Sequence, residues 1–116
     1  MTLNEARTLA LKFEEAIEAS HFEKASFRVN KKIFLTLDEK NKQACIPLSE
    51  ADQDVFHRMN PDTIFPIPNK WGKQGWTFLR LSGVTKTLFR DALTCAYCKV
   101  APKRLSEKYQ NARGEE

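Results

Sequence analysis

The stretch that decides the fold is residues 70–81, which read KWGKQGWTFLRL. Two glycines, Gly72 and Gly75, stand between two tryptophans, where they permit sharp turns and allow the backbone to approach a phosphate. The residues after the second tryptophan alternate, as expected of a strand over 76–81. One face of that strand carries Leu79 and Leu81, and the other carries Trp76, Phe78 and Arg80. We therefore expect a tight loop that leads into a strand with bulky side chains on both faces.

Before this stretch, the sequence predicts a helix, three strands and a second helix. Thr2 and Glu5 form a capping-box pattern, and apolar residues then recur at helical spacing, so a first helix is predicted over 3–19. Alternating residues predict strands at 27–29, 33–37 and 44–48, with Asn30 and Lys31 in the first turn. Ser49 begins a helix that ends before Pro61. The segment 63–69 contains prolines, which cannot donate to a neighbouring strand, and is therefore typical of an edge strand.

After the strand, a broad apolar stripe predicts a helix over 85–100, and Pro102 opens a short basic helix that ends near Tyr109. The order α-β-β-β-α-β-β-α-α indicates an α+β fold with an antiparallel sheet packed on helices. The 116 residues, of which 41% are hydrophobic, are sufficient for one compact core. We predict a single domain over 1–109 and a frayed tail over 110–116.

Charge is distributed unevenly along the chain. The net charge is +4, but residues 55–108 contain ten Lys or Arg against three Asp or Glu. Such asymmetry indicates a polyanionic partner, although charge alone also serves solubility. No stretch has a signal-peptide pattern or the length needed to span a bilayer, and an odd number of cysteines is typical of a reducing compartment. We expect a cytoplasmic monomer that does not bind a membrane.

Four segments of the chain form a recognisable combination: FRVNKKIF at 27–34, FPIP at 65–68, WGKQGW at 71–76 and VAPK at 100–103. Together they resemble the MmcQ/YjbR family, and the match covers most of the chain. The resemblance implies a compact α+β fold similar to the frataxin and secretion-chaperone architectures, in which paired β-hairpins form a double-wing DNA-binding arrangement.

Two positions depart from the pattern of that family. Lys31 stands where glycine often follows the asparagine of the first hairpin, which adds charge at a conformational cost if its φ is positive. The proline-glycine that commonly ends the first helix is replaced around Ala19 and Ser20.

The loop and the hairpins form a candidate nucleic-acid site. Lys70 and Lys73 supply positive charge, and Trp71 or Trp76 offers a ring for stacking on bases or deoxyriboses. The other candidates are basic residues that would extend a positive band: Arg28, Lys31, Lys32, Arg80, Lys103 and Arg104. Phosphate contacts of this kind predict DNA binding with low sequence specificity and a steep salt dependence. A continuous band requires both hairpins to project on the same side of the sheet.

Three alternatives remain open for the same region. Both tryptophans can instead fill the end of the core, with the glycines serving only a tight hairpin. The chain can be a protein-interaction module similar to secretion chaperones, because Pro66 and Pro68 on an edge and Trp76 with Phe78 on one face suit a partner segment. A small-molecule pocket under the loop is the third, but no convergent polar set supports it.

No residue pattern in the chain indicates an enzyme. Cys95 and Cys98 form a CxxC, but they fall deep within the predicted helix 85–100, whereas a reactive pair stands at a helix N-terminus. Cys45, His21 and His57 do not complete a zinc site, and neither histidine accompanies a nucleophile motif. The acidic face of the first helix is similar to the iron-binding ridge of frataxins, but it is more typical of a solvated face. We predict a non-catalytic domain without metal or cofactor.

Overall fold

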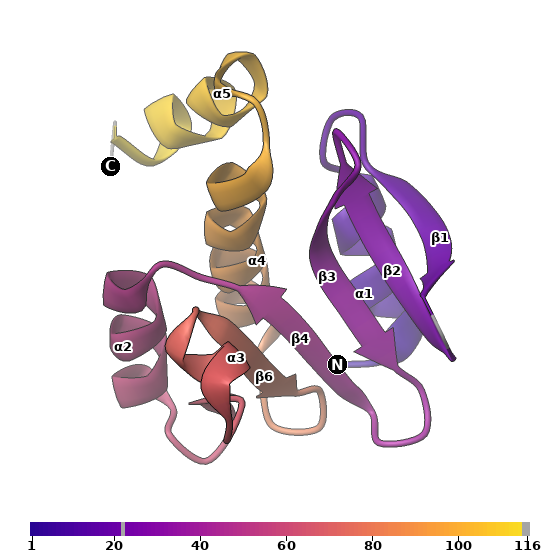
Figure 1. The fold of residues 1–116 in the computed structure, drawn as a ribbon, viewed down its shortest axis with the longest axis vertical. Coiled ribbons are helices and arrows are strands. Elements are labelled where there is room, and N and C mark those ends of the chain that lie inside the picture. Colours follow the sequence, from indigo (N-terminus) through magenta and orange to yellow (C-terminus); the bar gives the residue numbers. More distant parts are fainter. Residues whose placement is uncertain (22, 115–116) are drawn as a thin grey trace.

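The computed structural model describes residues 1–21 and 23–114, and of residues 21 and 110–114 it describes the backbone alone. It confirms the α+β class and the antiparallel sheet (Figure 1). The predicted elements occur in the predicted order, and the structure adds the first strand and a short helix within the glycine loop. The elements are α1 (Leu3–Leu11), β1 (Ile17–His21), β2 (Lys24–Val29), β3 (Lys32–Asp38), β4 (Gln43–Pro47), α2 (Glu50–Met59), β5 (Ile64–Pro66), α3 (Lys70–Lys73), β6 (Trp76–Arg80), α4 (Lys86–Val100) and α5 (Lys103–Gly114). The prediction that the last helix ends near Tyr109 is wrong, because α5 continues to Gly114, and residues 115 and 116 of the predicted tail lie outside the described residues.

The six strands form one sheet in the order β1-β2-β3-β4-β6-β5, and every neighbouring pair is antiparallel. The chain leaves β4 through α2 to the far edge, β5, and then returns through α3 so that β6 fills the gap. The β2–β3 turn is formed by Asn30 and Lys31, as predicted, with φ of 50° and 67°. Two left-handed residues in succession give the turn whose twist matches that of the flanking strands.

The core lies between the sheet and the helices α1 and α4, which Figure 1 shows behind the strands. Ala6 and Ala10 are fully buried on α1, because their small side chains allow the helix to approach the sheet closely. Tyr97 of α4 is fully buried and packs against Phe13 and Phe34, with ring centroids 4.7 and 5.4 Å away. The opposite face of the sheet is turned toward the viewer in Figure 1, and only the short α3 lies in front of its β6 end.

The first helix was predicted over 3–19, and this extent is wrong. α1 ends at Leu11, and the chain turns so that Phe13 enters the core and is only 7% exposed. Ile17 is then the first residue of β1, opposite Arg28 on β2. The helical spacing of the apolar residues was real, but covering the edge of β2 with another strand outweighs local helix propensity. The left-handed position after α1 falls at Glu15, with φ of 64°, and not around Ala19 and Ser20.

The edge strand β5 confirms the interpretation of the proline segment. Asn60 O accepts a hydrogen bond from Ile64 N at 2.9 Å, and the His57 ring lies 2.7 Å from Ile64 O. Pro66 has no N–H to offer. This edge is therefore closed to pairing with another strand, which is one way in which proteins prevent edge-to-edge association.

Candidate nucleic-acid interface

The predicted loop contains a single helical turn, α3, that presents Trp71 to solvent. Asn69 caps this turn, and its side-chain oxygen accepts a hydrogen bond from Trp71 N at 2.8 Å. Trp71 is 49% exposed, and Lys70 Nζ lies 5.6 Å from the centroid of its ring. Lys73 is exposed on the same turn. α3 therefore provides an accessible ring beside two positive charges.

The two glycines of the box are buried and serve backbone packing. A Cβ at Gly72 would lie 1.9 Å from Ile67 O, and one at Gly75 would lie 1.9 Å from Leu48 O. Gly75 also has a φ of 105°, which side-chain-bearing residues rarely adopt. Neighbouring backbone thus fills the space beside both glycines, which lie around the helical turn α3 and not in a tight hairpin.

A buried glutamine from α2 holds the box in place. Gln53 Nε2 donates to Gly72 O and to Thr77 Oγ1, both at 3.0 Å. Thr77 Oγ1 in turn donates to Gly75 O at 2.8 Å. Gln53 was not among the residues predicted from the sequence, although its spacing of three residues from Phe56 places both on the same side of the helix. Because these groups satisfy one another, the orientation of α3 against β6 is fixed.

Trp76, Phe78 and Arg80 lie on the face of the sheet that α1 and α4 leave uncovered. Trp76 and Phe78 are partly exposed, whereas Leu79 between Phe78 and Arg80 is fully buried. The Arg80 guanidinium carbon lies 5.3 Å from the ring centroid of Phe65 on β5. The side chain of Trp76 is therefore partly buried and partly accessible to solvent.

Comparison with known proteins bears on the family and the fold. The YjbR family model matches residues 11–99, which is more than half of the chain. The chain belongs to the YjbR family. As a YjbR member it resembles the crystal structure of protein DR2400 of Deinococcus radiodurans, described as a DUF419 domain. The TM-score is 0.76 at 17% identity, over 92% of this chain and 86% of the other, so that likeness shows the fold alone. None of the curated proteins compared with it matches the chain.

The remaining candidate residues lie elsewhere on this YjbR chain. Arg28 is on the uncovered sheet face, where its Nε donates to Ser26 Oγ at 3.3 Å. Lys31 and Lys32 are exposed at the β2–β3 turn, at the top of Figure 1, whereas α3 lies at the lower left. The structure thus brings the loop candidates together, places Arg28 and Arg80 on the sheet face, and leaves the turn lysines apart from α3.

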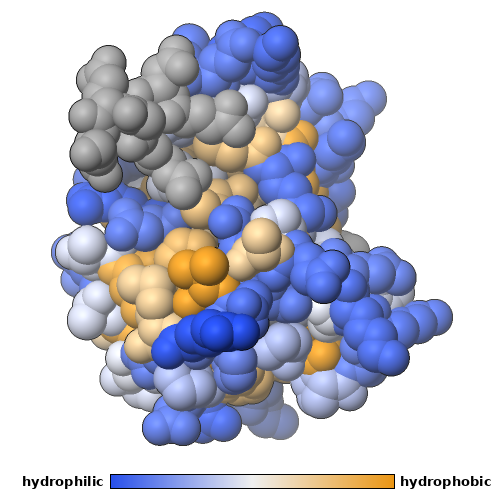
Figure 2. Space-filling view, turned by 90° about the vertical axis from the view of Figure 1, so that its left-hand side faces the viewer, coloured by the Kyte–Doolittle hydropathy of each residue, from blue (hydrophilic) through white to orange (hydrophobic). Residues whose placement is uncertain are grey.

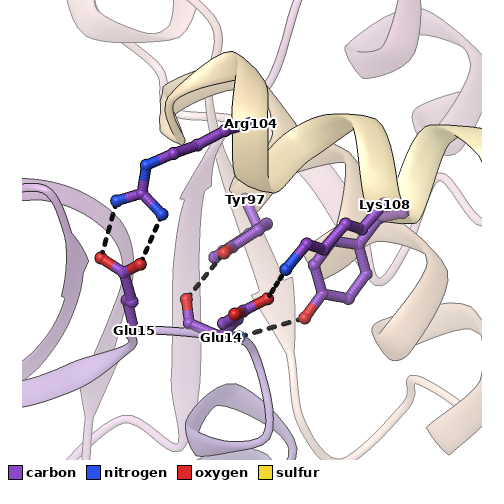
Figure 3. Close-up of polar contacts among 6 residues, drawn as sticks. Glu14, Glu15, Tyr97, Arg104 and Lys108 are labelled. Atoms are coloured by element: carbon purple, nitrogen blue, oxygen red, sulfur yellow. Dashed lines mark hydrogen bonds and ion pairs between the residues drawn. The ribbon is translucent and has the colours of Figure 1, made fainter.

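Arg104 and Lys108 of α5 form ion pairs with the turn between α1 and β1 (Figure 3). Arg104 forms two contacts with the Glu15 carboxylate, at 2.6 and 3.1 Å, and these hold the pKa of Glu15 below its usual value. Lys108 Nζ lies 2.7 Å from Glu14, and Lys103 pairs with Glu107 at 3.7 Å. Lys103 and Arg104 therefore carry less unbalanced charge than the lysines of α3.

Cys95 and Cys98 of this YjbR chain lie deep within a helix, as predicted. Cys95 is buried and Cys98 half-buried within α4, away from its N-terminus. Burial raises the pKa of the Cys45 thiol on β4 to about 12, so this thiol is not a reactive nucleophile at neutral pH. Among the side chains that the structure describes, no three of His, Cys, Asp or Glu gather as a metal site would require. No helix in the described part of the chain is long and apolar enough to cross a bilayer.

Proposed function

We propose that this protein is a non-catalytic DNA-binding domain of low sequence specificity, and that α3 is its principal contact with the sugar-phosphate backbone. The observation that carries the proposal is the exposed ring of Trp71 between Lys70 and Lys73. The exposed half of this ring is apolar surface in contact with water, and an accessible tryptophan ring stacks well on bases and deoxyriboses.

The geometry favours a phosphate backbone over base edges as the partner of these lysines. α3 is a single turn of four residues, too short to enter a groove as a recognition helix. Its lysines provide flexible point charges, which suit phosphates in many registers. Low specificity and a strong dependence on salt follow from such contacts.

The test is a salt titration of a labelled DNA followed by fluorescence anisotropy. The wild type is expected to lose affinity steeply between about 50 and 200 mM salt. K70A/K73A should bind more weakly and reduce the slope of log K against log salt by about two, because each lost phosphate contact on duplex DNA removes about 0.9 from it. A wild type that fails to bind at the lowest salt contradicts the proposal.

A matched control separates these lysines from general charge. K40A/K99A removes two other exposed lysines, one in the β3–β4 turn and one on α4, and changes the net charge equally. This variant should retain the wild-type slope. Equal loss of slope in both double variants contradicts a site at α3 and indicates attraction by net charge alone.

A second candidate function is a protein-interaction module, and one observation favours it. Val55 and Met59 are 53% and 61% exposed, and their spacing of four residues puts them on one face of α2. Figure 2 looks onto the side of the molecule that carries α2 and shows apolar surface surrounded by hydrophilic residues. A photo-crosslinker at position 59 that captures one protein in cells, with none captured from position 99, would support this function. Equal labelling from both positions would contradict it.

A further inference from the structure

We propose that the uncovered face of the sheet is a platform for single-stranded nucleic acid, on which unstacked bases lie against Phe65, Phe78 and Trp76. The inference rests on the proposed function and names the form of nucleic acid that this protein prefers. The uncovered face is defined here by side chains of β3, β4, β5 and β6: Thr36, Cys45, Phe65, Trp76, Phe78 and Arg80.

The strand register places these residues on one face. Phe78 is paired with Cys45 on one side and with Phe65 on the other, and Cys45 is paired with Thr36. Paired residues of antiparallel strands point to the same side of the sheet. All four side chains are partly exposed, which shows that no helix covers this row.

The neighbouring row shows the contrast. Leu37, Ala44, Leu79 and Ile64 are paired across the same four strands, and each is fully buried against the helices. The alternation of buried and exposed rows gives the sheet one packed face and one face toward solvent.

The aromatic side chains of the uncovered face are held in place by one another. The rings of Phe65 and Phe78 meet edge to face, with centroids 5.9 Å apart and an angle of 66° between their planes. The Arg80 guanidinium lies over Phe65 and adds a second planar, positively charged surface. Trp76 lies two residues before Phe78 on β6, about 7 Å away by the rise of a strand. Rings fixed in this way lose little conformational entropy when a base stacks on them.

Positive charge occurs beside these rings and farther along the sheet. Arg80 lies at the end of β6, beside the rings. Arg28 lies on the same face of the sheet, on β2, which is separated from β6 by β3 and β4. Lys24, at the start of β2, is near enough to favour the charged forms of Asp38 and Cys45, although the hydrogen bond from Asn41 is the main cause of the lowered pKa of Asp38 and burial raises the pKa of Cys45. Asp38 is the carboxylate in these paired rows, and two hydrogen bonds from Asn41, at 2.8 and 3.1 Å, already engage it. Three cations against one carboxylate favour a polyanion over an uncharged peptide.

The form of the nucleic acid follows from access to the bases. In a duplex the bases are stacked on one another and hydrogen-bonded, so their faces cannot reach a sheet. In a single strand they can be splayed apart, and side chains about 7 Å apart then each receive a base. Aromatic residues on a sheet with cations at its rim are the means by which proteins hold single strands without reading their sequence.

The experiment uses the two tryptophans as separate reporters and a phenylalanine substitution as the perturbation. W71F leaves Trp76, on the uncovered face, as the sole tryptophan, and W76F leaves Trp71 on α3. Oligothymidine of about 15 nucleotides should change the emission of the W71F protein, whereas a duplex of the same length should change it little. F78L should weaken binding of the single strand about 5- to 100-fold and leave duplex binding unchanged. Oligouridine is measured in parallel to show whether the sugar matters.

The matched control is F56L, which removes a ring of the same size from α2, where Phe56 is only 7% exposed. Thermal unfolding of both variants shows whether they remain folded at the assay temperature, and F56L should bind the single strand as the wild type does. Equal affinity of F78L and F56L for oligothymidine overturns the inference. Duplex binding that depends on Lys70 and Lys73 but not on Phe78, with no preference for single strands, overturns it while sustaining the proposed function. Absence of binding to any nucleic acid overturns both.

Discussion

Replacing Gly75 by alanine should destabilise the protein strongly, because two separate effects oppose a side chain there. The added Cβ would lie 1.9 Å from Leu48 O, which is a backbone atom. The Leu48 N–H donates to Gly75 O at 2.8 Å, so the two backbone segments cannot move apart without losing this hydrogen bond. Overpacking of this kind costs about 1–3 kcal/mol. The φ of 105° adds about 1–3 kcal/mol for a residue with a side chain. We expect a loss of about 2–6 kcal/mol in the free energy of unfolding.

Urea and thermal unfolding followed by circular dichroism measure this loss. For a chain of this size the melting temperature should fall by about 4 °C for each kcal/mol, hence by about 8–24 °C. G83A is the control, since an added Cβ there would meet the Thr63 side chain at 2.7 Å and no backbone atom within 3 Å. It should lose less than half as much stability. G75A with wild-type stability but impaired DNA binding would refute the packing role of the box glycines and restore a role in approaching phosphate.

Three further substitutions probe other parts of the account. K31G should raise the free energy of unfolding by about 1 kcal/mol, because Lys31 has a φ of 67° that glycine adopts without strain; an unchanged urea midpoint would argue against strain at the turn. Q53L should cost about 1–3 kcal/mol by removing two hydrogen bonds of about 0.5–1.5 kcal/mol each, those that Gln53 donates to Gly72 O and Thr77 Oγ1, and a value near zero would show that water replaces the lost amide. The Thr2 backbone N–H, followed by Lys86, lowers the pKa of Glu5 from 4.5 to about 2. Since the folded value is the lower one, the stabilisation is complete above pH 4.5 and is lost as the pH falls toward 2. The melting temperature of E5A should therefore be lower than that of the wild type at pH 7 and equal to it near pH 2. A difference in melting temperature that does not change with pH would contradict this assignment.

Local patterns in the sequence predicted much of the fold because the forces that set these elements act over a few residues. The cap at Ser49, the turn at Asn30 and Lys31 and the helix over 85–100 each depend on neighbours in sequence, and each is present. The first helix failed at Leu11 for the opposite reason. The helix ends there because the following residues pair with β2 as strand β1 and because Phe13 packs on Tyr97, more than 80 residues away in sequence.

The candidate site was predictable in composition but not in arrangement. Lys70, Trp71 and Lys73 were predicted to share a loop because they are close neighbours in the sequence. Gln53, which fixes that loop, and Phe65, which lies beneath Arg80, reach the site only through the strand order β4-β6-β5. A strand order with a crossover cannot be read from alternation, since the period of two is the same in any order. The ion pairs of Arg104 and Lys108 with the α1–β1 turn were hidden for the same reason.

The measurement that tests the central claim most directly is a titration of the ¹⁵N-labelled protein with oligothymidine and with duplex DNA, followed by NMR chemical shifts. The account predicts that duplex moves the signals of α3, above all the Trp71 indole N–H. It predicts that the single strand in addition moves the Trp76 indole and the amides of Phe78 and Arg80. Shifts confined to α2 around Val55 and Met59, or no shifts at low salt with either DNA, would contradict it.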